Sequence, residues 1–200
     1  MLYRILRVIA FPFVHIIFRL QIKGKENIPE NEGYIICANH VSIADVFALA
    51  YTFKPPIKFM AKAELMKFAP LKAFFTAMGA FPVERGKGDT GAIDKACDIL
   101  NNGGVFGIFP EGTRTKDGYI GRIKSGAAVI ASKTKATIIP VSLKYSTKKP
   151  KLFCKIYVNV GRPIPYQEPS SEISERGEIR NITEKIRDNI TELWEMDEWK

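Results

Sequence analysis

The sequence is poor in the residues that build disulfide and metal sites. Of its 200 residues, three are cysteine and two are histidine. The cysteines stand alone at Cys37, Cys97 and Cys154, so no C-x-x-C pair is present for a zinc ribbon or a thioredoxin-type motif. Cys37 and Cys154 lie in strand-like apolar runs, which predicts buried, reduced thiols, and a reducing, cytosolic environment fits best.

Long apolar runs and basic tracts are also missing. The longest uncharged run of the most apolar stretch covers residues 8–18, only 11 residues, whereas a transmembrane helix needs about 20. The densest basic run is the short K-K-P-K of residues 148–151, unlike the long basic arms of nucleic-acid-binding proteins. The sequence also contains neither a P-loop motif nor the G-x-S-x-G nucleophile elbow. The first two absences argue against a transmembrane helix and a nucleic-acid-binding arm, and the last two mean that neither a P-loop nor a nucleophile elbow supplies the chemistry.

What the chain does have is an excess of positive charge. Thirty Lys and Arg against 21 Asp and Glu give a net charge of +9 and a pI near 9.4. The charge is regional: residues 81–165 hold 15 basic and 6 acidic side chains, whereas residues 166–200 hold 5 basic and 10 acidic ones. An anionic partner is expected, and composition alone leaves nucleic acid, a lipid surface, a phosphorylated substrate and an acidic protein open.

The first 20 residues predict a helix in the membrane interface. Their polar side chains, Arg4, Arg7, His15 and Arg19, fall near one helical face, and the rest of the circumference is apolar. A narrow basic stripe on a wide apolar helix is typical of a segment that lies among anionic headgroups. The alternative is a helix packed on the protein's own core.

The remaining chain predicts one α/β domain over residues 21–200. Short, almost continuously apolar runs are typical of strands covered on both faces; they lie at 33–37, 57–60, 80–83, 105–109, 137–143 and 153–160. Helical segments alternate with them at 42–53, 63–78, 89–101 and 125–135, and an acidic amphipathic helix closes the chain at 171–198. This alternation predicts a mostly parallel central sheet flanked by helices.

A histidine follows the first of these strands, at the point where the chain enters a helix. In open α/β sheets, ligands bind beyond the carboxyl ends of the strands, which makes His40 a candidate functional residue. Ser42 and Asp45 form a capping-box pattern, and Asp45 at the third helical position points back toward His40. Its carboxylate is therefore expected to receive one ring N–H of His40, which leaves the other nitrogen to act as a general base. The alternative for Asp45 is a purely structural role in capping the helix.

No side chain of the sequence is a convincing nucleophile to pair with this base, so the hydroxyl it activates is expected on a substrate. Cations recur beyond several strand ends, some of them in glycine-rich loops, as in a phosphate site. They are Lys62, Arg85, Arg114 and Lys124. For any one of them alone, solvated surface remains the simpler interpretation.

Four blocks together resemble the glycerolipid acyltransferase family, most closely the 1-acylglycerol-3-phosphate acyltransferases. They match in order over roughly residues 23–165: the N-H-x-x-x-x-D motif at 39–45, a second block at 79–85, the F-P-E-G-T-R box at 109–114, and Ile139-Pro140-Val141. The second block departs slightly from the family pattern, because Phe81-Pro82 replaces aliphatic residues and Glu84 precedes Arg85.

The resemblance implies a glycerol-3-phosphate acyltransferase-like fold and roles for the matching residues. His40 deprotonates the sn-2 hydroxyl of a lysophosphatidic acid acceptor, which attacks the thioester of acyl carrier protein or coenzyme A, and Asp45 orients His40. The implied substrate-binding residues are Lys62, Arg85, Glu111, Gly112, Thr113, Arg114 and Lys124, and Pro140 and Val141 help to form the acyl-chain or donor pocket. No metal or other cofactor is expected, and the reduced thiols and the N-terminal segment predict a monotopic or peripheral protein on the cytoplasmic face of the cell membrane.

Other functions stay open at the level of sequence. The acceptor could instead be glycerol-3-phosphate or another lysophospholipid. A different class, a non-catalytic lipid-binding module at the membrane surface, leaves His40, Asp45 and Glu111 as coincidences. A metal hydrolase built on His40 lacks further histidine ligands apart from His15, and a nucleic-acid binder is suggested by the pI alone.

Overall fold

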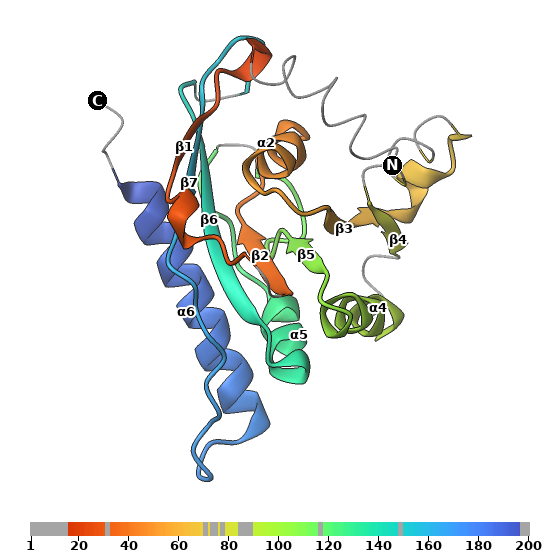
Figure 1. The fold of residues 1–200 in the computed structure, drawn as a ribbon, viewed down its shortest axis with the longest axis vertical. Coiled ribbons are helices and arrows are strands. Elements are labelled where there is room, and N and C mark those ends of the chain that lie inside the picture. The colour runs from red at the N-terminus through yellow and green to blue at the C-terminus, as the bar shows by residue number, and fades with distance from the viewer. Residues whose placement is uncertain are drawn as a thin grey trace.

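The computed structural model describes residues 16–30, 33–69, 72, 76, 79–83, 90–115, 118–147 and 150–196. Strands and helices alternate along most of the chain (Figure 1). The strands are β1 (Gln21–Lys23), β2 (Tyr34–Ala38), β3 (Ile57–Lys62), β4 (Phe81–Val83), β5 (Val105–Ile108), β6 (Thr137–Tyr145) and β7 (Ile156–Val160). The helices are α2 (Ala44–Thr52), α4 (Thr90–Asn101), α5 (Gly126–Thr134) and α6 (Glu175–Glu195), with 3₁₀ turns η1 (Lys25–Asn27) and η2 (Ala63–Met66).

Seven strands form one sheet in the order β1-β7-β6-β2-β5-β3-β4. The five strands β6, β2, β5, β3 and β4 run parallel to one another, while β7 runs antiparallel to β6 and β1 pairs parallel with β7. The carboxyl ends of the five parallel strands therefore meet at one edge of the sheet, here called the carboxyl edge. Parallel neighbours need crossover connections, and the helices supply them.

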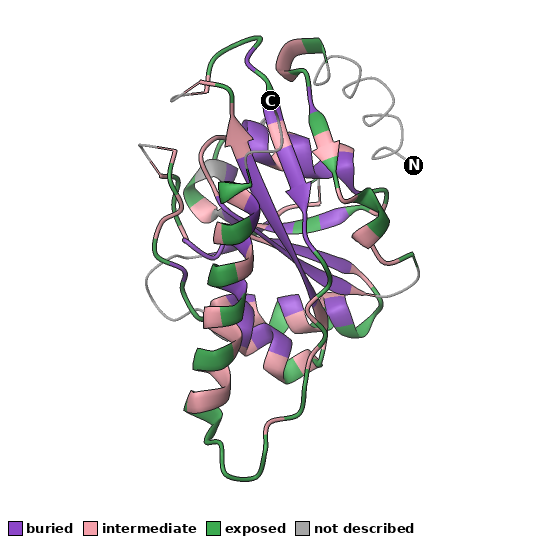
Figure 2. Cartoon of the chain, turned by 90° about the vertical axis from the view of Figure 1, so that its left-hand side faces the viewer, coloured by how far each residue is buried: buried purple, intermediate pink, exposed green. Residues whose placement is uncertain are grey.

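Helices cover both faces of the sheet, so the central strands are buried on both sides. On one face, Ala48, Leu49 and Phe53 of α2 and its end pack on β2, β3, β6 and β7. On the other, α4, α5 and α6 enclose a second core that includes Phe106, Ile130 and Ile186. Figure 2 shows this arrangement as buried strands between helices with exposed outer faces. All five residues of β2 are buried, as its continuous apolar run predicts.

The single α/β domain and the mostly parallel sheet expected from the sequence are confirmed, with differences at particular elements. Strand β1 was not expected, because its three residues, Gln-Ile-Lys, are mostly polar and become a strand only by pairing with β7. The stretch expected to form a helix from residue 63 begins as the 3₁₀ turn η2. The last helix begins at Glu175 rather than at 171, because Ser174 caps it by accepting the Gly177 N–H.

The predicted N-terminal segment falls mostly outside the described residues. Of residues 1–20 the structure describes only the last five, and residues 16–18 are helical. Within the described part of the chain, every helix is too short or too polar to cross a bilayer. The three cysteines are free thiols, with Cys37 and Cys154 buried.

Candidate active site

His40 and Asp45 face each other at the carboxyl edge. His40 lies two residues beyond the end of β2 and ahead of α2, so it is not on the helix that carries Asp45. Its Nδ1 lies 2.9 Å from Asp45 Oδ2, and the side chains are 12% and 0% exposed. The predicted contact is therefore present. It leaves Nε2 as the ring nitrogen that is not engaged with the carboxylate.

The Asp45 carboxylate is held by donors from three directions. Its Oδ2 also accepts the backbone N–H groups of Val41 at 2.6 Å and Ser42 at 2.8 Å, and its Oδ1 accepts the hydroxyl of Tyr145. The predicted capping box is formed only in part, because the Ser42 hydroxyl accepts from Ala44 N–H at 3.3 Å and not from Asp45. These donors fix the position of the buried carboxylate.

Tyr145 is a site residue that the sequence analysis missed. It is the last residue of β6 and lies 100 positions from Asp45 in the chain. Burial, the charge of Asp45 and the hydrogen bond to it raise the pKa of Tyr145 far above its usual range. The phenol therefore stays protonated and donates to Asp45. The signal for this role is the register of β6 against β2, which the sequence alone does not reveal.

Asn39 fixes the backbone immediately before His40. Its side chain is fully buried; Nδ2 donates to the carbonyl of Leu143 at 2.9 Å, and Oδ1 accepts the Leu143 N–H at 2.7 Å. Backbone pairing between β2 and β6 ends at Ala38 and Val141. The amide thus continues the ladder by one step after the main chain has turned away, which pins the start of the His40 loop to β6.

Glu111 binds the backbone of His40 itself. It is 4% exposed, and its two oxygens accept the N–H of His40 at 3.1 Å and that of Gly121 at 3.0 Å. The His40 carbonyl accepts the N–H of Thr115 at 2.8 Å and its hydroxyl at 3.2 Å. The F-P-E-G-T-R box, through Glu111, and Thr115 directly after it therefore bind the two backbone groups of His40. In the structure, Glu111 contacts the loop backbone.

The imidazole ring rests on Phe109, the residue after β5. The two ring centroids are 4.0 Å apart and nearly parallel, and Phe59 stacks behind Phe109 at 5.9 Å. These contacts add an apolar wall on one face of the ring. Together with Asp45, they leave the imidazole little freedom to rotate.

The predicted cations fall into two groups. Arg114 and Lys124 are exposed at the carboxyl edge: Arg114 precedes Thr115, which binds the His40 carbonyl, and the backbone N–H of Lys124 donates to Pro110 at 2.9 Å. Lys62 ends β3 at the same edge, but its side chain is outside the described structure, and Arg85 lies outside the described residues altogether.

Gly112 and Thr113 lie directly before Arg114, in a turn that the Lys124 side chain approaches. Gly112 has a φ of +74°, a conformation that favours glycine, and the Lys124 ammonium comes within 2.8 Å of the position that a Cβ would occupy there. Thr113 is exposed on the next step of the chain. Because residue 112 has no side chain, the Lys124 side chain lies directly against its backbone. Lys124 is thereby brought to a point two residues before Arg114 in the chain.

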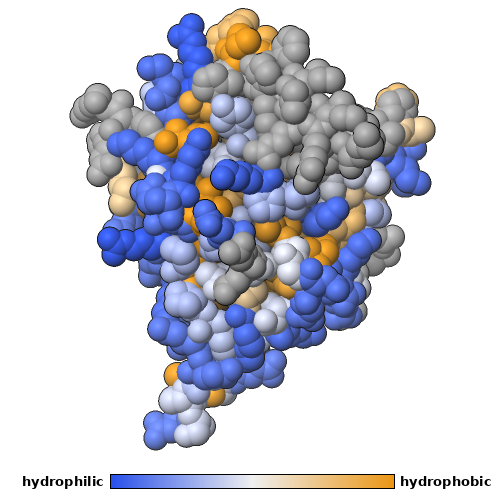
Figure 3. All heavy atoms as spheres, in the orientation of Figure 1, coloured by the Kyte–Doolittle hydropathy of each residue, from blue (hydrophilic) through white to orange (hydrophobic). Residues whose placement is uncertain are grey.

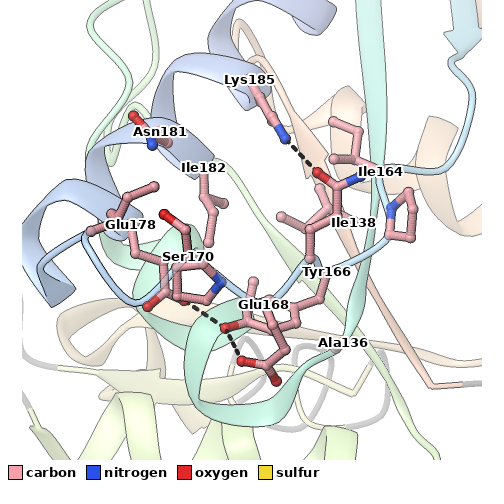
Figure 4. A pocket seen from close by; sticks show the side chains of 15 residues that line it. Ala136, Ile138, Ile164, Tyr166, Glu168, Ser170, Glu178, Asn181, Ile182 and Lys185 are labelled. Atoms are coloured by element: carbon pink, nitrogen blue, oxygen red, sulfur yellow. Dashed lines mark hydrogen bonds between the residues drawn. The ribbon is translucent and has the colours of Figure 1, made fainter.

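A separate cavity of about 210 Å³ lies at the opposite edge of the sheet (Figure 4). Its walls come from the start of β6, residues 164–170, Ile173 and helices α5 and α6. Tyr166 in this wall accepts from Lys135 at 2.7 Å and donates to Glu178 at 2.9 Å. None of the predicted site residues whose side chains the structure describes lines it. The chemistry implied by His40 is thus not in this cavity.

The fold and the site define an α/β enzyme with a histidine–aspartate pair and cationic loops at the carboxyl edge of a parallel sheet. Residues 19–144 match the family model described as "Acyltransferase", and the chain belongs to this acyltransferase family. It is 30% identical over 177 residues to a 1-acyl-sn-glycerol-3-phosphate acyltransferase of Bacillus subtilis, covering 87% of each chain. It is 32% identical to the enzyme of that name from Borreliella burgdorferi, covering 88% of this chain and 72% of the relative.

A solved structure shares the fold. The crystal structure of the 1-acyl-sn-glycerophosphate acyltransferase from Thermotoga maritima superposes with a TM-score of 0.75 at 25% identity, covering 99% of this chain and 81% of that one. The family resemblance drawn from the four sequence blocks is thereby confirmed.

Proposed function

We propose that this enzyme transfers a fatty acyl group from a thioester donor to the sn-2 hydroxyl of 1-acyl-sn-glycerol-3-phosphate, forming phosphatidic acid. The observation that carries the proposal is the His40–Asp45 contact at 2.9 Å in a chain whose curated relatives bear this activity in their names. The donor is acyl carrier protein or coenzyme A, both of which are anionic and suit a cationic edge.

In this mechanism His40 is the general base. Asp45 accepts a hydrogen bond from the N–H at Nδ1, so the unprotonated Nε2 is free to act as the base. Nε2 accepts the proton of the acceptor hydroxyl as the hydroxyl oxygen attacks the thioester carbonyl. A C–O bond forms, the tetrahedral intermediate collapses, the C–S bond breaks, and the departing thiolate takes the proton from His40. Asp45 stabilises the imidazolium between these two steps. General-base assistance of this kind is worth about 10²–10⁴-fold in rate.

The acceptor phosphate is assigned to Arg114 and Lys124, with Lys62 and Arg85 as further ligands from β3 and the chain after β4. Arg114 and Lys124 are exposed and lie on the loop that holds the His40 backbone. A phosphate between them sets the distance from the headgroup to the reacting hydroxyl. Glu111, Gly112 and Thr113 then act by shaping the loop that presents these cations.

We further propose that the enzyme works on the cytoplasmic face of the membrane. The apolar, Arg-bearing segment of residues 1–20 is suited to lie in the interface, where the acceptor is found. This places the N-terminal share of the positive charge among anionic headgroups.

The decisive test compares wild type with His40→Ala and with Asn102→Ala, an exposed control just after the end of α4. Each protein is offered lysophosphatidate, glycerol-3-phosphate or another lysophospholipid, with acyl carrier protein and coenzyme A donors in parallel. We expect His40→Ala to lose transfer to lysophosphatidate by at least about 10²-fold while staying folded, and Asn102→Ala to match wild type. Equal activity of His40→Ala and wild type refutes the base, and preference for another acceptor refutes the assigned substrate.

Initial-rate kinetics test the absence of a protein nucleophile. Direct attack by the acceptor requires both substrates to be bound together, so double-reciprocal plots at several donor concentrations are expected to intersect. Parallel lines indicate an acyl-enzyme and ping-pong exchange, and they contradict the proposed role of His40.

A further inference from the structure

The hairpin between β6 and β7 carries an apolar tip that the fold does not bury. Leu152 and Phe153 are 71% and 62% exposed, the first being the most exposed large hydrophobic residue of the described chain. They are the two central residues of a β-turn closed by Cys154 N–H to the Lys151 carbonyl at 3.3 Å. Single exposed apolar residues are ordinary, but two adjacent large ones at a projecting tip mark a contact surface.

The geometry of the turn directs these side chains outward. Phe153 has a φ of +64°, a conformation that glycine or asparagine adopts more easily at this position of a turn. The neighbouring Cys154 is buried, and the base of the hairpin is closed by two hydrogen bonds of 3.0 Å between Ser146 and Lys155. The core thus holds the hairpin at Cys154, while neither the core nor the turn requires an aromatic side chain at Phe153.

Positive charge flanks the apolar pair. Lys151 and Lys155, on either side of Leu152–Cys154, are both exposed. The tip therefore combines apolar side chains that seek a hydrocarbon environment with ammonium groups that seek anions. An anionic bilayer surface offers both at the right depth, with headgroup phosphates above acyl chains.

The tip lies at the same end of the molecule as the His40 site. β6 ends at Tyr145, which donates to Asp45, and the hairpin continues from there beyond the carboxyl edge. Figures 1 and 2 place residues 16–18 next to the tip at this end, and Ile16 is 64% exposed. Figure 3 shows hydrophobic side chains there, beside strongly hydrophilic ones.

We propose that the tip formed by Lys151–Lys155 is a membrane contact of its own, in which Leu152 and Phe153 enter the interface of an anionic bilayer and Lys151 and Lys155 bind its headgroups. This contact goes beyond the proposed acyl transfer and beyond the N-terminal segment. It holds the carboxyl edge, and with it His40, against the lipid surface. It does not depend on catalysis, so it is measured with donor-free vesicles.

A local probe decides whether the tip enters the bilayer. Phe153→Trp in the full chain is mixed with phosphatidylcholine vesicles that contain phosphatidylglycerol, and the wild-type spectrum is subtracted. We expect a blue shift in the emission of the introduced tryptophan and quenching by brominated lipids. The matched control is Ile173→Trp, at an apolar position that is 40% exposed in the chain before α6, where no change is expected.

Substitutions at the tip test what drives the contact. Phe153→Gly relieves the positive φ, so we expect an equal or higher melting temperature together with about tenfold weaker partitioning into the vesicles. Weaker binding by a more stable protein separates lost contact from damaged folding. Lys151→Gln and Lys155→Gln are each expected to weaken binding about fivefold at low salt, whereas Arg176→Gln, at the first turn of α6, leaves it unchanged.

Two outcomes overturn the proposal. In the first, the wild type sediments with the vesicles while the emission of Phe153→Trp does not change and Phe153→Gly binds as well as wild type. In the second, the emission of Phe153→Trp responds to acyl carrier protein and not to vesicles, which makes the tip a protein-docking surface. His40→Ala separates this proposal from the proposed function, since it is expected to lose acyl transfer and to keep vesicle binding.

Discussion

Replacing Asn39 by aspartate tests whether its amide extends the sheet. The substitution keeps the shape of the side chain and exchanges the NH₂ donor for an oxygen. One carboxyl oxygen still accepts the Leu143 N–H, whereas the other faces the Leu143 carbonyl, which is 2.9 Å from Nδ2 in the native protein. Because the site is fully buried, two facing oxygens with no proton between them are strongly unfavourable.

The folded variant relieves this conflict by binding a proton, and this sets the size of the effect. An unfolded aspartate has a pKa of about 3.9, so holding its carboxyl protonated at about pH 7 costs about 1.36 kcal/mol per pH unit, or about 4 kcal/mol. At about pH 5 the cost falls to about 1.5 kcal/mol by the same rule. The pKa of the introduced carboxyl is raised in the folded variant, so the stability deficit is small in acid and grows as the pH rises.

Thermal unfolding followed by circular dichroism measures both values. For a chain of this size, about 4 kcal/mol lowers the melting temperature by about 8–16 °C at about pH 7, and about 1.5 kcal/mol lowers it by about 3–6 °C at about pH 5. Asn39→Ala loses both hydrogen bonds at every pH, so its deficit is expected to be the same at the two values. Asn102→Asp, at an exposed asparagine that also donates to a backbone carbonyl, is the matched control and is expected to change little. A deficit for Asn39→Asp that does not depend on pH refutes the assigned hydrogen bonds.

Two further predictions concern Tyr145 and the cysteines. Tyr145→Phe removes a donor from the charged Asp45, so we expect a loss of about 1.5–3 kcal/mol in the free energy of unfolding; Asp45 then binds His40 more strongly, and the acidic limb of the kcat/KM profile moves to higher pH. An unchanged pH profile contradicts this positioning role. Burial raises the pKa values of Cys37 and Cys97, so at about pH 8 the folded protein is expected to react slowly with a disulfide reagent, and unfolding in denaturant to release all three thiols. If three equivalents of thiol react rapidly in the folded protein, the predicted protection of the cysteines is wrong.

The contacts that the sequence predicts are local ones. His40 and Asp45 are five residues apart, and the strand–helix junction alone brings the carboxylate back to the ring. Strand β2 is equally accessible to prediction, because a run of five buried apolar residues has few other solutions. The recurrence of cations after strand ends is also visible, since parallel strands deliver their carboxyl ends to one edge.

Contacts that depend on strand register are beyond the sequence. The partners of Asn39 and Asp45 on β6 lie 104 and 100 residues away, and a shift of one residue in pairing turns Tyr145 to the other face of the sheet. Strand β1 exists only through β7, for the same reason. The role of Glu111 is similar: its motif marks it as important, but only the fold shows that it holds the His40 backbone.

The carboxyl edge explains why a part of the excess positive charge is concentrated where it is. Arg114 and Lys124 follow β5, and Lys151 and Lys155 follow β6, so four exposed cations are brought to one end of the molecule by strands that are neighbours of β2. An enzyme that acylates a lipid must hold an anionic headgroup at the base while the acyl chain stays in an apolar phase. A site recessed far from the protein surface forces the chain to leave the bilayer, at about 0.8 kcal/mol per CH₂ group exposed to water. The proposed base, the proposed phosphate ligands and the apolar hairpin tip all lie at the same edge; with the roles proposed above, this arrangement avoids the cost, because the hydroxyl reaches His40 while the acyl chain remains in the membrane.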